Sequence, residues 1–108
     1  MILLRLTAVV IHLPIEHRWP RGILERASIL RHLERLPGGQ LVIVRYSASH
    51  DPNAEWVYNE ADIEAAKVIW ARDMGKEDNR ELLEYFRGRN AWVVEGDGPV
   101  FQAVPYSD

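Results

Sequence analysis

Apolar residues recur at helical spacing over residues 21–36 and define the first strong element of the chain. The repeat comprises Ile23, Leu24, Ala27, Leu30, Leu33 and Leu36. Arginine and glutamate side chains fill the opposite face, which is the pattern of a helix with one side in water. Pro20 suits the first turn of such a helix, and Pro37-Gly38-Gly39 ends it. The spacing therefore predicts an amphipathic helix over 21–36.

Three short apolar runs, at 41–46, 67–72 and 91–95, have the β-branched composition of strands. They alternate little between apolar and polar residues, as strands covered on both faces do, so they favour a parallel sheet packed against helices. A polar loop over 47–58 and an amphipathic segment over 77–88 lie between them, and crossovers of about 20 residues suffice for parallel neighbours. The sequence therefore predicts a small three-layer Rossmann-like or flavodoxin-like α/β domain with a mostly parallel sheet of three to five strands.

Local signals complete the expected fold. Asn59 is expected to cap a short helix over 60–66, because an asparagine side chain accepts a hydrogen bond from a free N–H of the first turn. Gly88 suits a left-handed end to the helix over 77–88. Residues 100–104 are expected to add an edge strand, and Pro105 is expected to end it.

An apolar N-terminal segment, residues 1–18, precedes the α/β domain expected over 19–108. Its run over 2–13 is shorter than the roughly 20 residues that span a bilayer, and Arg5 and His12 interrupt it. It also lacks the cleavage site of a signal peptide. We interpret it as a strand or a membrane-proximal connector. We expect it to be buried against the sheet edge or against a second copy of the chain, so that its deletion lowers stability or solubility.

Charge and composition narrow the function classes. The net charge is −3, too small to indicate a nucleic-acid partner. The charge is uneven, with +4 over residues 1–50 and −7 over residues 51–108. The chain has no cysteine, which excludes disulfides, thiolate catalysis and cysteine-bound zinc. Acidic residues in the second half are either a solvated surface or carboxylates gathered at one site.

The candidate chemistry lies in the loops that follow the three strands, because ligands of parallel α/β sheets bind outside the carboxyl ends of the strands. The candidate binding rim comprises Ser47, His50, Asp51, Trp56, Arg72, Asp73, Glu95 and Asp97. Trp56 is either a binding aromatic in the long loop or a buried ring that pins that loop. Strand order decides which of these side chains lie close together.

Three interpretations of this rim stay open. Asp51, Asp73 and Asp97 are weak candidates for a Mg²⁺ site, since magnesium prefers oxygen ligands. His50 with Asp51 or Asp73 would form an acid–base pair. The third interpretation is structural, because aspartate and serine at strand ends commonly form turns and helix caps. We expect the third, with no bound metal.

Motifs of the common cofactor and catalytic sites are absent. The chain lacks GxGxxG, GxxxxGK[ST], GxSxG and HExxH. Gly38-Gly39 precedes a predicted strand instead of following one, so it ends a helix and does not cradle a phosphate. The sequence therefore predicts no cofactor and identifies no catalytic residue.

Several short segments between residues 20 and 98 resemble a known group of proteins. They read VRY, EWVYN, ADI, KVIWARDM, LLEYF and VVEGD. With these segments the chain resembles the C-terminal soluble region of uncharacterised bacterial multi-span membrane proteins of the glycosyltransferase type, related to protein mannosyltransferase-like enzymes.

The resemblance implies an accessory domain on the extracytoplasmic face of a bacterial inner membrane. In such proteins the catalytic carboxylates lie near the first membrane spans, so no catalytic residue is carried over to this chain. The expected partners are the parent membrane protein or a second copy of the chain, with contact to the membrane only through the N-terminal region. Against this non-catalytic binding domain stands the alternative of a small hydrolase- or transferase-like enzyme that uses the acidic rim.

Overall fold

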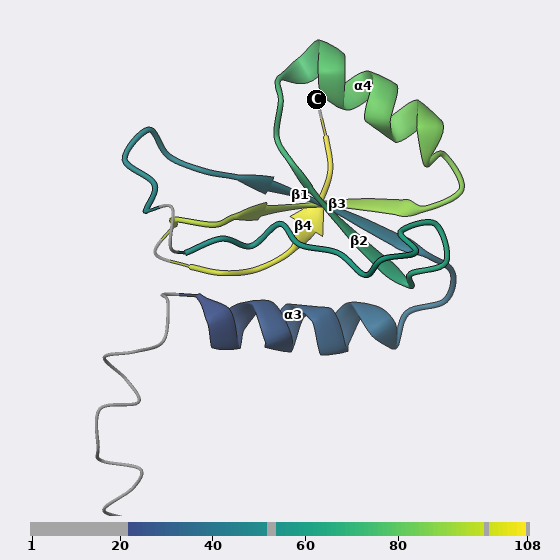
Figure 1. The fold of residues 1–108 in the computed structure, drawn as a ribbon, viewed down its shortest axis with the longest axis horizontal. Coiled ribbons are helices and arrows are strands. Elements are labelled where there is room, and N and C mark those ends of the chain that lie inside the picture. The colour runs from purple at the N-terminus through teal and green to yellow at the C-terminus, as the bar shows by residue number, and fades with distance from the viewer. Residues whose placement is uncertain (1–21, 52–53, 99, 108) are drawn as a thin grey trace, which may run out of the picture.

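A computed structural model describes residues 22–51, 54–98 and 100–107 of the chain (Figure 1). Its elements, in chain order, are α3 (Ile23–Glu34), β1 (Gln40–Arg45), β2 (Val68–Arg72), α4 (Lys76–Tyr85), β3 (Asn90–Glu95) and β4 (Val104–Pro105). The N-terminal segment 1–18, with its expected burial, lies outside the described residues. In the part that is described, neither helix has the length and apolar character needed to cross a membrane.

The strands form one four-stranded sheet in the order β2-β1-β3-β4. β1 is parallel to both neighbours, with Val42 level with Trp70 of β2 and with Trp92 of β3. This confirms the predicted parallel arrangement of the three apolar runs. The central position of β1 explains its composition, because Leu41, Val42, Ile43 and Val44 are all buried.

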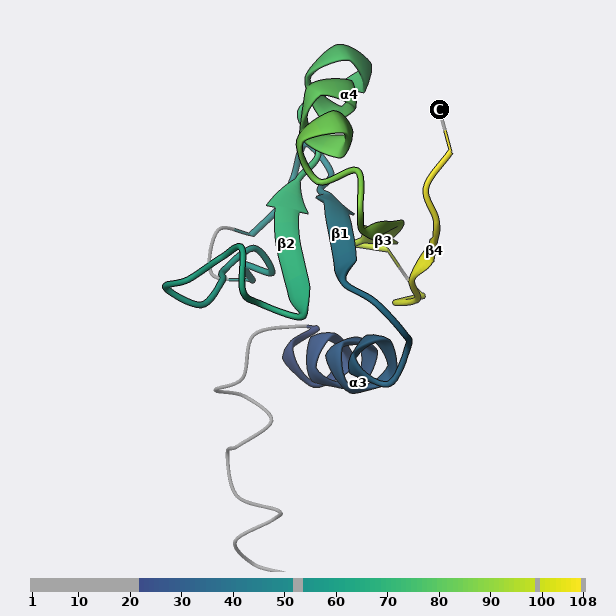
Figure 2. The ribbon, with the colours of Figure 1, turned by 90° about the vertical axis from the view of Figure 1, so that its right-hand side faces the viewer.

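The helices α3 and α4 pack against different faces of the sheet and lie on opposite sides of it in both views (Figure 1, Figure 2). Ile29 and Leu33 of α3 pack with the even-numbered residues Val42 and Val44 of β1. Leu82, Leu83 and Phe86, in and after α4, pack on Leu41 and Ile69. The alternation of side chains along a strand sends these two sets to opposite faces. The described part of the chain is thus a small α/β domain with a mostly parallel four-stranded sheet and two helices.

The short helix expected over 60–66 does not form. Residues 61–65 make bends and a turn, in which the backbone N–H of Ala65 donates to the Asp62 side chain. Asn59 has a different role from the predicted cap: its amide donates to the Trp70 carbonyl, and its side-chain oxygen accepts from the Trp70 N–H, both at 2.8 Å. The Asn59 side chain therefore pairs with the outer edge of β2 as a neighbouring strand would, and this satisfies an edge that would otherwise be open.

Two further local predictions are corrected. The last strand is shorter and later than expected, since β4 contains only Val104 and Pro105 and runs antiparallel to β3. Pro105 is accommodated there because β4 is an edge strand and its missing N–H removes no central pairing. The left-handed glycines are Gly22, Gly38 and Gly75, so Gly88 is not the left-handed helix end that was expected.

Candidate functional site

His50 and Asp97 meet at the carboxyl ends of β1 and β3, which we call the carboxyl edge of the sheet, although 47 residues separate them along the chain. The Nδ1 atom of His50 donates to Oδ1 of Asp97 at 2.8 Å, and the backbone N–H of Ser47 donates to Oδ2 of Asp97 at 2.8 Å. β1 and β3 are adjacent and parallel, so the turns that follow them lie together. The carboxylate therefore joins the loop after β1 to the turn after β3.

The imidazole of His50 is mostly enclosed. Its ring stacks on Tyr46 with 3.8 Å between ring centroids, and its side chain is 11% exposed. The second ring nitrogen, Nε2, is buried and has no hydrogen-bond partner among the described residues. A histidine oriented by a carboxylate through Nδ1 has the arrangement of a general base. The burial of Nε2 removes the access to solvent that a substrate would need in this conformation.

A second network at the same edge connects Tyr46, Glu55 and Arg72. The Tyr46 hydroxyl donates to Glu55, the Trp56 N–H donates to the Tyr46 oxygen at 2.8 Å, and Arg72 pairs with Glu55 at 3.0 Å. Burial, with the hydrogen bond to Glu55, raises the pKa of Tyr46 to about 12. The hydroxyl is therefore a fixed donor at neutral pH, and this network holds the loop after β1 onto the end of β2.

The remaining rim carboxylates point elsewhere. Asp73 lies 3.5 Å from Arg45 and accepts a hydrogen bond from the buried side chain of Asn79, at the start of α4. Glu95 lies 3.9 Å from the same Arg45. Asp51 is exposed. Within the residues that the structure describes, no three acidic or histidine side chains gather as a metal site would require. The acid–base pair of His50 with Asp51 or Asp73, one of the interpretations left open, does not form, since His50 pairs with Asp97.

Trp56 is part of the core and does not belong to an exposed rim. Its side chain is 1% exposed, stacks on Phe101 at 5.4 Å and meets the edge of Trp70 at 6.1 Å. Of the two roles left open for this ring, the structure gives it that of the buried anchor. The long loop needs such an anchor because it contains no helix of its own in its described part.

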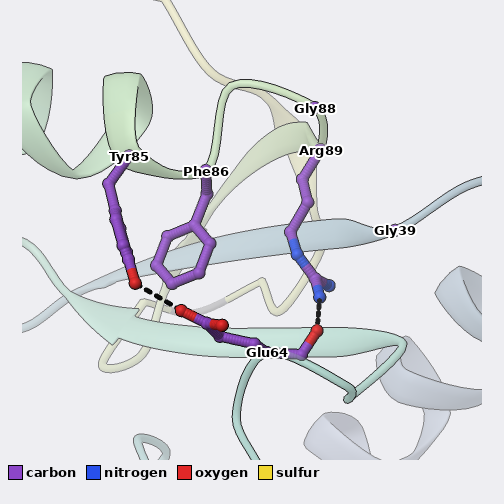
Figure 3. Close-up of a pocket in the computed structure, with 6 residues that line it drawn as sticks. All are labelled: Gly39, Glu64, Tyr85, Phe86, Gly88 and Arg89. Carbon is purple, nitrogen blue, oxygen red and sulfur yellow. Dashed lines mark hydrogen bonds between the residues drawn. The ribbon is translucent and has the colours of Figure 1, made fainter.

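An open cavity lies at the other end of these strands, near the amino ends of β1 and β2 (Figure 3). Its volume is about 500 Å³, and its lining comprises Gly39, Glu64, Tyr85, Phe86, Gly88 and Arg89. Sequence reasoning missed these residues because it searched only the carboxyl ends of the strands. The signal available in the sequence was the adjacent aromatic pair Tyr85-Phe86 at the end of the predicted helix. In the structure Tyr85 is exposed and does not belong to the core.

Comparison with known proteins found no match: no family model, no curated protein and no solved structure is significantly similar to this chain.

Acid is expected to weaken the contacts that Asp97 and Glu55 make at the carboxyl edge. Partial burial opposes ionisation of Asp97 and Glu55, but hydrogen bonds outweigh it and lower both pKa values: His50 and the Ser47 N–H act on Asp97, and Tyr46 and the Val57 N–H on Glu55. A carboxyl group with a lower pKa in the folded state stabilises the fold above its unfolded pKa, near 4, and this stability is lost as pH falls through the folded value. The urea midpoint, measured at a series of pH values from 7 to 3, should therefore begin to decrease once the pH is below about 4.5.

The variant Asp97→Asn isolates the contribution of one carboxylate. Its amide oxygen still accepts from the Ser47 N–H but does not titrate, so its acid-induced loss of stability should be smaller than that of the wild type. Asp62→Asn, at an exposed turn, serves as the control. Identical acid limbs for Asp97→Asn and the wild type would contradict the assignment.

Magnesium is expected to leave thermal stability unchanged. A ligand that binds only the folded state raises the melting temperature by mass action. Asp73 and Asp97 have separate protein partners and do not converge, so roughly millimolar Mg²⁺ has no prepared site at this edge. A rise in melting temperature that Asp73→Asn abolishes would show that the carboxylates rearrange around the ion.

Proposed function

We propose that this chain is a non-catalytic binding domain, and the soluble C-terminal part of a membrane protein of the glycosyltransferase type. The first half of this proposal rests on one observation: the polar side chains at the carboxyl edge are bonded to other groups of the protein. His50, Asp97 and Asp73 are engaged with protein groups, and the free nitrogen of His50 is buried. These side chains brace loops against one another instead of surrounding an open cleft, as an acid–base or metal site would require.

The second half of the proposal rests on the resemblance of residues 20–98. Three of the segments that carry it are structural in this fold. VRY ends the central strand, KVIWARDM contains β2, and VVEGD forms the end of β3 with its turn. The resemblance therefore lies in residues that build the sheet and not in residues that would carry catalysis. The extracytoplasmic location is part of the same proposal.

We also propose that the fold is a small three-layer Rossmann-like one. The strand order supports this, since β2-β1-β3 reproduces the start of the flavodoxin-like order, in which the chain reverses direction across the sheet after β1 and β2. The His50–Asp97 contact joins the loop after β1 to the turn after β3, at the carboxyl ends of these two neighbouring strands.

Fractionation of cells that express the natural gene tests the membrane proposal. An antibody against residues 22–107 should detect a polypeptide larger than 12.5 kDa in the membrane fraction. Protease added to spheroplasts should remove the epitope, whereas a cytoplasmic marker protein should survive. A band near 12.5 kDa in the soluble fraction, or an epitope that is protected until the cells are lysed, would contradict the proposal.

The alternative enzyme is favoured by one observation, the orientation of His50 by Asp97 with an unpaired Nε2. An unsatisfied buried polar atom calls for an explanation, and a catalytic role is one. Hydrolysis of p-nitrophenyl acetate tests it. We expect the wild type and His50→Gln to hydrolyse this ester at equal rates, with His32→Gln on the exposed side of α3 as the control. A rate for the wild type that exceeds both His50→Gln and Asp97→Asn by about 100-fold would establish the enzyme instead.

A further inference from the structure

The cavity at the amino edge contains an unusual combination of groups. Two aromatic residues at the end of α4, Tyr85 and Phe86, form one wall, and Arg89 and the backbone of Gly39 form another (Figure 3). Glu64 reaches into the same space from the connection before β2. A volume of about 500 Å³ falls within the range of small-molecule sites.

The positive charge of Arg89 is held by neutral partners. Its guanidinium donates to the carbonyl oxygens of Glu64 at 2.9 Å, Lys67 at 3.1 Å and Gln40 at 3.3 Å. These bonds fix the side chain across the amino ends of β1 and β2. No carboxylate within the described part of the chain forms an ion pair with Arg89, so its charge is positioned but not neutralised.

The negative charge of Glu64 is held in a corresponding way. Its carboxylate accepts a hydrogen bond from the Tyr85 hydroxyl, a neutral donor. It forms no ion pair with a described lysine, arginine or histidine, although Arg89 contacts the carbonyl of the same residue. An anion and a cation therefore line one cavity without pairing with each other, which leaves both available to a ligand.

The wall between the two charges is apolar. The rings of Tyr85 and Phe86 lie with centroids 4.7 Å apart and planes at 70°. Phe86 is half-buried against Leu41 and Ile69 of the sheet, which fixes its position, and its ring hangs over Glu64 in Figure 3. Such a ring provides a rigid surface for the apolar part of a ligand.

We propose that this cavity binds a small zwitterion with an apolar body, of the amino-acid class. The ligand's ammonium group pairs with the Glu64 carboxylate, its carboxylate pairs with the Arg89 guanidinium, and its apolar part lies on Phe86. A ligand with a single charge satisfies only one of the two protein charges and is opposed by the other. The inference rests on the proposed binding function and names the ligand class of that function.

Three probes of matching shape test the charge requirement: L-phenylalanine, 3-phenylpropionate, which lacks the ammonium group, and phenethylamine, which lacks the carboxylate. Binding is followed by the backbone amide NMR signals of Gly39, Gly88 and Arg89 and quantified by calorimetry. L-Phenylalanine should bind at least about tenfold more tightly than either analogue, since each lost charge-assisted hydrogen bond weakens binding by at least that factor.

Two variants locate the site without disturbing the fold. Glu64→Gln should weaken binding of L-phenylalanine about tenfold or more and leave 3-phenylpropionate unaffected or better bound, whereas Glu77→Gln, on the exposed first turn of α4, should change neither. Gly88→Leu should abolish binding, because Gly88 lines the cavity and a leucine side chain there takes up ligand space. The fold should tolerate this substitution, since a Cβ at Gly88 meets no atom within 4 Å and the backbone is not left-handed. Arg89 is left intact because it pins three carbonyl groups.

Each outcome decides the proposal. Equal affinities for phenethylamine and L-phenylalanine would make this a cation site and overturn it, as would equal affinities for 3-phenylpropionate and L-phenylalanine. Absence of amide shifts with all three probes at roughly 10 mM would also overturn it, since a site built for this class should bind with a millimolar constant or better. The fractionation experiment above is independent of these probes, so a failed ligand class and a failed accessory-domain proposal are distinguishable.

Discussion

Replacement of Trp56 by alanine is expected to lower the free energy of unfolding by about 3–5 kcal/mol, the usual cost of removing a large aromatic side chain from a core. The ring is 1% exposed and packs between Phe101 and Trp70, so it joins the long loop, the C-terminal segment and β2. Its loss removes contacts in three parts of the chain at once. Because small domains are only marginally stable, this loss is a large fraction of the total free energy of unfolding.

Urea denaturation followed by circular dichroism measures this effect. Trp56→Phe should recover most of the stability, since it retains an aromatic ring in the same space. Leu24→Ala is the matched surface control, because Leu24 is 64% exposed on α3, and its effect should stay within about 0.5 kcal/mol. A urea midpoint for Trp56→Ala equal to that of the wild type would mean that the loop does not depend on this anchor.

Replacement of Arg26 by methionine is expected to cost about 1.5–3 kcal/mol, the range for a hydrogen bond to a charged group. The buried guanidinium donates to the carbonyl of Trp56 at 2.8 Å and to that of Tyr58 at 3.0 Å. It also lies over the rings of Tyr58 and Trp70, 3.7 Å and 4.1 Å from their centroids. Methionine has a similar volume but leaves both carbonyl oxygens without a donor.

The two positive charges of α3 give a matched comparison. Arg31→Met changes the same residue type on the exposed face of the helix and should alter the unfolding free energy by less than about 0.5 kcal/mol. Arg26→Lys should fall between the two, since lysine keeps the charge but not the planar group that bonds two carbonyls and stacks on rings. Equal midpoints for Arg26→Met and Arg31→Met would contradict the bracing role. Hydrogen exchange at the Trp56 and Tyr58 amides should accelerate in Arg26→Met, which locates the effect in the loop.

The secondary structure was largely predictable because its signals are local. Gln40–Arg45 and Val68–Arg72 are short, β-branched and apolar on both sides, and the residues of 23–34 repeat at helical spacing. The long crossovers between these continuous apolar strands were enough to predict that the strands pair in parallel. The failure at 60–66 is instead tertiary in origin. Asn59 was a plausible helix cap, but the unpaired N–H and C=O of Trp70 at the sheet edge bind its side chain instead.

The site depended on distances that the sequence does not contain. The sequence shows that polar residues follow each strand. It does not show the order of the strands in the sheet, in which β1 lies between β2 and β3. That order brings Asp97 to His50 and leaves Asp73 with Arg45 and Asn79. It also places Glu64 and Arg89 in one cavity without pairing them. A side chain's partner is chosen among all groups that folding brings within about 3 Å. For Asp97 and Arg89 that choice was made by packing between segments 22 to 50 residues apart.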